Sequence, residues 1–379
     1  MRLPLGRTLA LLAGWALLGA ACAPAAAPAS PAKPAATAAA PATAPTIAPA
    51  APAAAAAASP AAKSAPAPTT VQMATLRAAS DAGLFIALER GYFAEQGIDA
   101  QFAEIGLGSD IAAMLAANQI QVGGAAITAG LLNAAARGIE TKVVADKGAN
   151  PHGFSFTALL VRKDLVDSGA YSGPADLKGL KIAVPDLVSG GMIELEQMLR
   201  RGGLTPADAE FVSLPFPDQI PALGNKAIDA AITIEPFVTI ATANGSAVRA
   251  MGVDEVLEGH QVGVLMYGLQ FANTDAAKRF MAAYVKGLRD YNDAFVKNQD
   301  LDAVVDIIAK HSATKDPALL KRMVPAGLNP DGYVNEQSIA GDLDWYFERG
   351  HVAQRPDLNR LVDNSYVDYA IQQLGRYAR

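Results

Sequence analysis

Small, polar, acidic and aromatic residues follow several short apolar runs of this sequence, and together they suit the binding of a small solute. In the first half of the chain these residues are Ser80, Asp81, Gly108, Ser109 and Thr128. In the second half they are Ser189, Gly190 and Gly191 at "SGG", and Glu235 and Phe237 at "EPF". A glycine-rich helix start can offer backbone N–H groups to an oxyanion, while Phe237 and Met192 supply apolar walls. The pattern predicts non-covalent binding of a small polar or anionic organic molecule.

Each polar position also has a purely structural interpretation. Ser80, Ser109 and Ser189 are suitable helix N-caps, and Glu235 suits the positive end of its own helix. If Glu235 faces the solute, its carboxylate favours an amine-bearing or hydrogen-bond-donating molecule over a bare anion. From the sequence alone both interpretations stay open.

The residue types predict neither a metal site, nor a cofactor, nor an enzyme. His152, His260, His311 and His351 are scattered without an i, i+4 pair, and Cys22 is the single cysteine. No Ser-His-Asp set or paired carboxylates can be placed from spacing, and "GLGSDI" lacks the third glycine of a dinucleotide fingerprint. Surface or core positions are the default for the histidines, with His152 the one placed to face a cleft.

The elements that must position these loops alternate between strand and helix patterns. The strand "VQMATLRAA" is followed by the helix "GLFIALERGYFAEQG" and the strand "IDAQFAEI", and the alternation restarts at "KIAVP". This order predicts an α/β fold of two lobes, each a mostly parallel sheet covered by helices on both faces. Such sheets bind ligands beyond the carboxyl ends of their strands, where the candidate residues lie.

Two segments in the two halves resemble each other. "NQIQVGGAAI" at 118–127 and "NKAIDAAITI" at 225–234 share a helix-to-strand transition, with Ile120 matching Ile228 after one insertion. Duplication and shared α/β composition explain this equally well.

The chain after residue 263 predicts a return strand, "GVLMYGLQFAN", and then helices only. One helix has an apolar stripe: Phe280, Tyr284, Leu288, Tyr291 and Phe295. We expect these helices to pack on the first lobe, with crossovers near 156–162 and 263–271 that form a hinge. The predicted lobes are 71–158 and 159–263, with the return segment and C-terminal helices at 264–379.

The N-terminus predicts export. Arg2 and Arg7 precede a short apolar run, which indicates a signal peptide over 1–21. The "AAC" ending resembles a bacterial lipobox, which implies acylation of Cys22, although Leu18 lies one place too early and ordinary cleavage near an Ala-x-Ala site is the alternative.

A spacer and an acidic body follow Cys22. Residues 23–70 contain 26 alanines and 11 prolines among 48 residues, so 22–70 is interpreted as a tether, or as a tail without a mechanical role. The chain has a net charge of −6, and its first 70 residues hold two arginines, two lysines and no acid, which leaves −10 on the body. This charge argues against nucleic acid as a partner, and a single cysteine excludes an intrachain disulfide framework.

Five segments resemble the solute-binding proteins of bacterial ABC importers for nitrate, sulfonate and taurine, and their relatives for the thiamine pyrimidine precursor. The matching segments are "ERGYFAEQGIDAQFAE", "GSDIAAMLAANQIQVGGAAITAGLLNAAARG", "DLKGLKIAVP", "GGLTPADAEFVSLPFPDQIPAL" and "AIDAAITIEPF".

The resemblance implies a two-lobed periplasmic-binding-protein fold of the type II class, with two crossovers. It also implies a monomer that delivers a small solute to an ABC permease and its ATPase. This monomer would be exported to the periplasm or to the outer face of the membrane and held there by a lipid anchor. The alternatives are a thiamine-pyrimidine-synthase-like enzyme, whose cysteine-rich motif is absent here, and a ligand-presenting sensor component.

Overall fold

A computed structural model describes residues 68–104, 110–139 and 141–378. The predicted signal peptide, Cys22 and the tether lie outside the described residues, and so do Gly108 and Ser109. The described residues belong to one compact unit. No helix in the described part is long and apolar enough to cross a membrane.

The first sheet has five strands in the order β2-β1-β3-β10-β4. Their bounds are β1 Thr69–Ala74, β2 Ile98–Phe102, β3 Val122–Ala126, β4 Thr141–Asn150 and β10 His260–Gly268. Strand β1 pairs in parallel with β2 and β3, while β10 is antiparallel to both β3 and β4. The late strand β10 therefore returns from the middle of the chain into the first sheet.

The second sheet repeats this arrangement in the order β7-β6-β8-β5-β9. Its bounds are β5 Thr157–Arg162, β6 Lys181–Val184, β7 Glu210–Ser213, β8 Ala230–Ile234 and β9 Ala247–Gly252. Strand β3 is third in the first sheet and β8 is third in the second. The two similar sequence segments, 118–127 and 225–234, therefore end in strands at equivalent positions of the two sheets. Ile120 and Ile228, the matched pair, are both buried.

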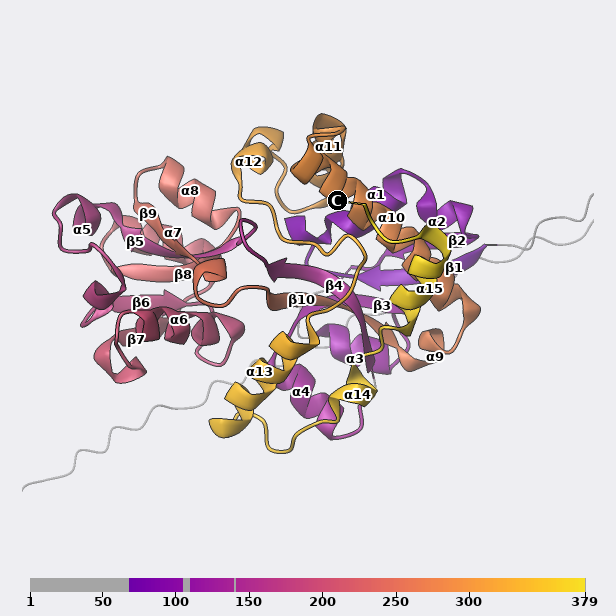
Figure 1. The fold of residues 1–379 in the computed structure, drawn as a ribbon, viewed down its shortest axis with the longest axis horizontal. Helices are drawn as coiled ribbons and strands as arrows, with labels where there is room; N and C mark the ends of the chain where they lie inside the picture. The colour runs from indigo at the N-terminus through magenta and orange to yellow at the C-terminus, as the bar shows by residue number, and fades with distance from the viewer. Residues whose placement is uncertain (1–67, 105–109, 140, 379) are drawn as a thin grey trace, which may run out of the picture. The chain divides into compact units, whose positions relative to one another are not determined.

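Helices cover both sheets (Figure 1). The helices that accompany the first sheet in this part of the chain are α1 Ala82–Glu89, α2 Tyr92–Glu95, α3 Asp110–Ala116 and α4 Ala129–Ala136. Those that accompany the second sheet are α5 Lys163–Asp167, α6 Gly190–Arg201, α7 Phe216–Gly224 and α8 Phe237–Ala243. Short 3-10 turns are η1 Ala79–Asp81, η2 Pro174–Leu177, η3 Pro206–Asp208 and η4 Val253–Glu255. We call β1–β4, β10 and their helices the first lobe, and β5–β9 with α5–α8 the second lobe.

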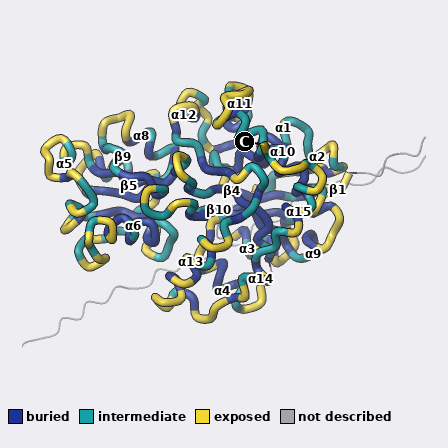
Figure 2. The backbone as a smooth tube through the Cα atoms, viewed as in Figure 1, coloured by how far each residue is buried: buried dark blue, intermediate teal, exposed yellow. Residues whose placement is uncertain are grey.

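The chain ends in helices, as predicted. They are α9 Leu269–Ala272, α10 Asp275–Lys297, α11 Leu301–His311, α12 Pro317–Arg322, α13 Glu336–Glu348, α14 Leu358–Leu361 and α15 Ser365–Leu374. Four residues of the predicted α10 stripe are buried and Phe295 is partly buried, in a cluster that includes α1 and the first sheet. Figure 2 shows the buried strands in dark blue inside helices with exposed outer faces.

The crossovers lie earlier than predicted. Strand β4 ends at Asn150 and β5 begins at Thr157, while β9 ends at Gly252 and β10 begins at His260. The chain therefore changes sheets at 151–156 and 253–259, not at 156–162 and 263–271. The two apolar runs that suggested crossovers are buried strands of the sheets that the chain enters, and β5 and β10 have strand neighbours on both sides.

Candidate ligand-binding site

Lys147 on β4 is the buried cation nearest to the predicted site residues of the first lobe. Its side chain is 9% exposed, and its Nζ lies 2.8 Å from Oδ1 of Asp81. The same Nζ donates to Oγ of Ser80 at 3.4 Å. Since Ser80 and Asp81 follow β1, the ammonium group lies at the carboxyl end of that strand. The sequence analysis did not identify Lys147.

Two glycines on neighbouring strands lie beside the Lys147 side chain, and one of them, Gly124, makes room for it. A Cβ at Gly124 of β3 would lie 2.6 Å from Cε of Lys147, which is closer than carbon atoms approach. A Cβ at Gly263 of β10 would lie 3.7 Å from Nζ. The lysine stem therefore crosses the sheet over backbone that carries no side chains.

Asp81 divides its two carboxylate oxygens between backbone and lysine. Oδ2 accepts from the backbone N–H of Ala78 at 2.8 Å, and Oδ1 faces Lys147. Asp81 is fully buried, so this pairing compensates a charge that would otherwise be expensive to bury. Asp81 therefore holds the η1 turn to the sheet and orients the ammonium group.

Phe156, in the first crossover, connects this cluster to the second lobe. Ser80 and the Phe156 ring both lie next to Gly148: a Cβ atom added to this glycine would be 3.5 Å from Cβ of Ser80 and 3.6 Å from Cζ of Phe156. The carbonyl oxygen of Phe156 accepts from the backbone N–H of Glu235 at 2.9 Å. The ring of Phe156 thus lies near Ser80, and its backbone bonds to Glu235, the two residues having been predicted from opposite halves of the chain.

The Glu235 carboxylate is already satisfied by protein donors. Oε2 accepts from the backbone N–H of Thr239, and Oε1 accepts from the Thr239 hydroxyl at 3.0 Å and the backbone N–H of Val324 at 3.1 Å. Burial raises the pKa of Glu235, and these donors oppose the rise. The interpretation of Glu235 as a residue that stabilises its own helix, α8, fits these contacts, and the bond to Val324 also connects the two lobes.

Phe237 begins α8 and lies against another aromatic ring. Its ring stacks with that of Phe216 at the start of α7, with centroids 6.2 Å apart and planes inclined by 21°. Both rings come from helix starts of the second lobe. Phe216 extends the apolar wall that the sequence assigned to Phe237, whereas Met192, the other predicted wall residue, is buried in the protein core.

The "SGG" start of α6 packs more closely than predicted. Ser189 donates its hydroxyl to the carbonyl oxygen of Asp186 at 2.6 Å, so it does not cap α6. A Cβ at Gly190 would lie 3.4 Å from Cε1 of His260, and one at Gly191 would lie 3.2 Å from Cδ of Pro185. A side chain at Gly190 would make an ordinary contact with His260, and one at Gly191 would require a small shift of Pro185.

Thr128 acts as the N-cap of α4. Its Oγ1 accepts from the backbone N–H of Leu131 at 3.2 Å, and the residue is exposed. The structural interpretation therefore accounts for Thr128. The structure brings Ser80 and Asp81 together at Lys147. Glu235 bonds to the backbone of Phe156 instead, and Thr128 and Ser189 bond to their own loops.

His260 lies between two carboxylates, one from each lobe. Nδ1 lies 2.9 Å from Oε1 of Glu194 on α6, and Nε2 lies 3.1 Å from Oδ1 of Asp342 on α13. Burial lowers the pKa of His260, but the carboxylates of Asp342 and Glu194 outweigh this effect and raise it to about 10. Burial raises the pKa of Glu194. The sequence analysis assigned His260 only the default of a surface or core position, because both of its partners are distant along the chain.

His152, which the sequence placed near a cleft, has an 89% exposed side chain, and its Nδ1 is 4.0 Å from Oδ2 of Asp254. Within the described part of the chain, no group of three His, Cys, Asp or Glu side chains is arranged to hold a metal ion.

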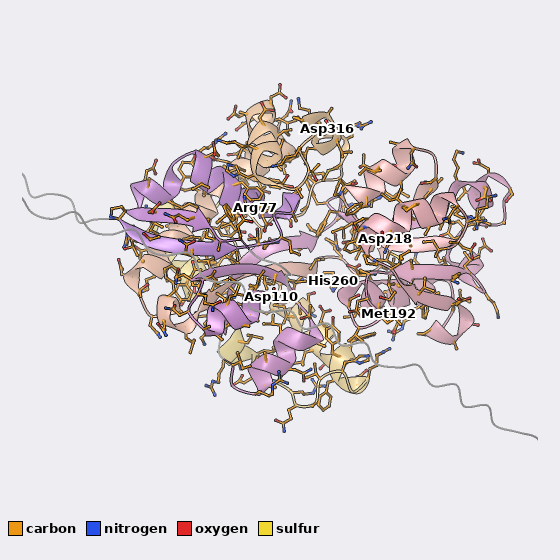
Figure 3. All side chains as sticks on the ribbon, turned by 180° about the vertical axis from the view of Figure 1, so that it is seen from behind. Arg77, Asp110, Met192, Asp218, His260 and Asp316 are labelled. Atoms are coloured by element: carbon orange, nitrogen blue, oxygen red, sulfur yellow. The ribbon has the colours of Figure 1, made fainter. Side chains whose placement is uncertain are left out.

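A cavity of about 460 Å³ lies between α6 and α13, with His260 and Asp342 in its wall. Ile193, Gln197 and Arg200 of α6 line one side, and residues of α13 line the other. None of the predicted site residues lines this cavity. Figure 3 shows Arg77 and Asp110 with the first sheet, Met192 and Asp218 with the second, and His260 between them.

Solved structures with the same fold include proteins that bind small anions. The periplasmic nitrate-binding protein NrtA from Synechocystis PCC 6803 has a TM-score of 0.64 and 16% identity, over 81% of this chain and 89% of NrtA. The periplasmic aliphatic sulphonate binding protein SsuA from Escherichia coli has a TM-score of 0.61 and 19% identity, over 77% of this chain and 91% of that one. The alkanesulfonate-binding protein SsuA from Xanthomonas axonopodis pv. citri, bound to MOPS, has a TM-score of 0.59 and 18% identity, over 79% and 99%.

These likenesses confirm the predicted periplasmic-binding-protein fold of two α/β lobes. A comparison with curated proteins gives no match. Residues 79–294, more than half of the chain, match the family described as "NMT1/THI5 like", and this chain therefore belongs to the NMT1/THI5-like family.

Proposed function

We propose that this chain is the solute-binding component of an ABC importer, and that it holds a small polar or anionic organic solute between its lobes. The observation that carries the proposal is the Lys147 ammonium group held beside Ser80 at the carboxyl end of β1, next to the first crossover, where Phe156 bonds through its backbone to Glu235 of the second lobe. Loops at the carboxyl ends of strands are where open α/β sheets bind ligands. The nitrate- and sulfonate-binding proteins of the same fold support this solute class.

Lys147 supplies the charge for an anionic solute. Its ammonium group has three N–H donors, of which one is donated to Ser80, and the group also pairs electrostatically with Asp81. A sulfonate, nitrate or carboxylate oxygen is the natural partner for a remaining donor. The stacked rings of Phe216 and Phe237 provide an apolar surface for the organic part of the solute.

The delivery system belongs to the same proposal. Acylation of Cys22 would hold the chain at the outer face of the membrane, and the Ala/Pro-rich segment would let a monomeric body reach the permease, whose ATPase drives transport. Taurine is one member of the proposed sulfonate class. A sensor component that presents the same solute to a membrane receptor would bind it identically, and neighbouring permease and ATPase genes would favour import.

An enzyme on this fold is the less favoured alternative. The cysteine-rich motif of the thiamine-pyrimidine synthases is absent, because Cys22 is the single cysteine. Among the described histidines, the buried His260 contacts two carboxylates and no serine or cysteine. Neither feature supplies an activated nucleophile.

A thermal-shift screen tests the proposal directly. The purified chain is heated with nitrate, taurine, alkanesulfonates, bicarbonate, pyrimidines and aromatic acids, and a ligand of the native state raises Tm with the logarithm of its excess over Kd. We expect a shift with at least one sulfonate or nitrate. Absence of a shift with every class, or turnover of any compound, contradicts the proposal.

A pair of variants then locates the site. Ser80→Leu places a bulky apolar side chain beside Lys147 and should abolish the shift. The matched control, Ser168→Leu, changes an exposed serine whose hydroxyl bonds only to the carbonyl oxygen of Leu165. If Ser80→Leu remains folded and keeps the full shift, the site lies elsewhere.

A further inference from the structure

Helix α13 connects the lobes at a point that neither crossover occupies. It belongs to the C-terminal helices, yet it packs against α6 of the second lobe as well as against α4 and β10. Buried apolar residues of both helices, Ile193, Ile339 and Leu343, belong to one continuous cluster. The two lobes therefore share apolar core along this contact.

Buried charges strengthen the α6–α13 contact. Glu194, His260 and Asp342 are each no more than 4% exposed, and the imidazole joins the other two. We call these three residues the His260 cluster. Asn150, the last residue of β4, donates from Nδ2 to Oε1 of Glu194 at 3.3 Å. The cluster thus also includes the end of the strand that leads into the first crossover.

A second acidic residue of α6 contacts α13 on its own. Oε2 of Glu196 accepts from Nε1 of Trp345 at 3.0 Å and from Nη2 of Arg349 at 2.6 Å. The guanidinium of Arg349 in turn lies over the Trp345 ring, 4.3 Å from its centroid. The last turn of α13 and the residue that follows it therefore bond to α6.

Separating α6 from α13 would leave charged groups without partners in an apolar environment. The loss of one partner from a buried ion pair typically costs more free energy than the loss of a hydrogen bond to a charged group. The contact on the α8 side of the crossovers is a hydrogen bond of this weaker kind, because there the Glu235 carboxylate accepts from the backbone N–H of Val324. In Figure 1 the α6 and α13 labels lie below the labels of β4 and β10, the first-lobe strands next to the crossovers, and the α8 and α12 labels lie above them.

We propose that the His260 cluster holds the second lobe to the first as a third connection, and that any rotation between the lobes turns about the α6–α13 contact. This contact then persists in the open and the closed protein, while the sheet edges at β2 and β7, which lie farthest from the crossovers in strand order, move apart. The inference depends on the two-lobed fold and not on the identity of a solute.

Distances between spin labels test the proposal in the protein with an intact His260 cluster. Cys22 is replaced by serine so that introduced cysteines are the only labelling sites. One pair, Arg200→Cys with Glu348→Cys, spans α6 and α13, and the other, Asp99→Cys with Glu210→Cys, spans β2 and β7; all four positions are exposed. We expect a narrow distance distribution across α6–α13 and a wider one across β2–β7. Equal widths, or a wider distribution across α6–α13, would overturn the proposal.

Variants of the cluster provide the second test. Glu194→Gln and Asp342→Asn remove one charge each at constant volume and should broaden the α6–α13 distribution. Asp331→Asn is the matched control, because Asp331 pairs with Arg289 inside the first lobe at 2.9 Å. An α6–α13 distribution that stays unchanged in both folded cluster variants refutes the role of the cluster.

Trp345 gives an independent readout. The chain has two tryptophans, Trp15 and Trp345, so a Trp15→Phe background leaves emission from Trp345 alone. Loosening of α6 from α13 should shift this emission to the red and increase quenching by acrylamide in Glu194→Gln. The control Asp331→Asn should leave both unchanged. A solute screen without any hit would contradict the proposed function but would not alter these outcomes.

Discussion

Nζ of Lys147 lies 2.8 Å from Oδ1 of Asp81, and the lysine reaches it across Gly124 and Gly263 of two intervening strands. This pair sets the electrostatics of the first-lobe side of the proposed site. It also makes the site depend on glycines that contact no solute. The first two predictions test this dependence.

Gly124→Ala should destabilise the protein by about 1–3 kcal/mol, the usual cost of overpacking a core. The added Cβ would meet Cε of Lys147 at 2.6 Å and Cγ2 of Thr75 at 2.9 Å. Urea unfolding measures the change. The control Gly130→Ala, with its nearest contact at 3.6 Å inside α4, should be neutral or stabilising by up to about 1 kcal/mol. Equal effects of the two substitutions would contradict the packing argument.

Lys147→Met should cost about 3–5 kcal/mol, because it leaves the carboxylate of Asp81 buried without its cation. Adding Asp81→Asn removes that charge, so the double variant should be more stable than the sum of the single changes implies. A double-mutant cycle from chemical unfolding gives the coupling energy. Strict additivity would mean that the 2.8 Å contact has no energetic role.

Stability should fall as the pH rises through the alkaline range. The pKa of His260 is raised to about 10 in the folded protein, against about 6.5 in the unfolded chain. Because the folded value is the higher one, the stabilisation is complete below pH 6.5 and is lost as the pH approaches 10. Between pH 7 and 9 we expect a loss on the order of 2 kcal/mol, with each pKa unit worth about 1.4 kcal/mol.

Unfolding curves at several pH values check this prediction. Asp342→Asn removes the strongest of the influences that raise the His260 pKa and should flatten the alkaline dependence. His152→Gln is the control, since its side chain is 89% exposed and should leave the pH profile of the wild type unchanged. An identical alkaline slope in Asp342→Asn and the wild type would refute the assignment.

Cys22→Ser should release the mature chain from the membrane in the native host. Two or more acyl chains anchor a protein stably, and a chain without them has no equivalent attachment. Partition between detergent and aqueous phases, with mass spectrometry of the N-terminal peptide, measures the change. If the wild-type protein is itself aqueous and its Cys22 is unmodified, the ordinary signal-peptide interpretation holds.

Local sequence patterns predicted the alternation of strands and helices, the apolar stripe of α10 and the C-terminal helical region, and the structure confirms them. The family resemblance predicted from five segments is confirmed as well. These features depend on periodicity within ten to twenty residues, which a single sequence displays directly. The predicted positions of the two crossovers were wrong, because a buried strand and an apolar linker have the same composition.

The sequence by itself determined two α/β lobes and the loops at their strand ends, because hydrophobic periodicity and glycine-rich turns are local properties. Only the tertiary structure decided that Lys147 faces Asp81, that Gly124 leaves space for its stem, and that His260 joins Glu194 to Asp342. Each of these relationships depends on strand order and helix packing between segments far apart in the chain. A residue's charge and size do not specify its distant partner; the register of the packed elements does.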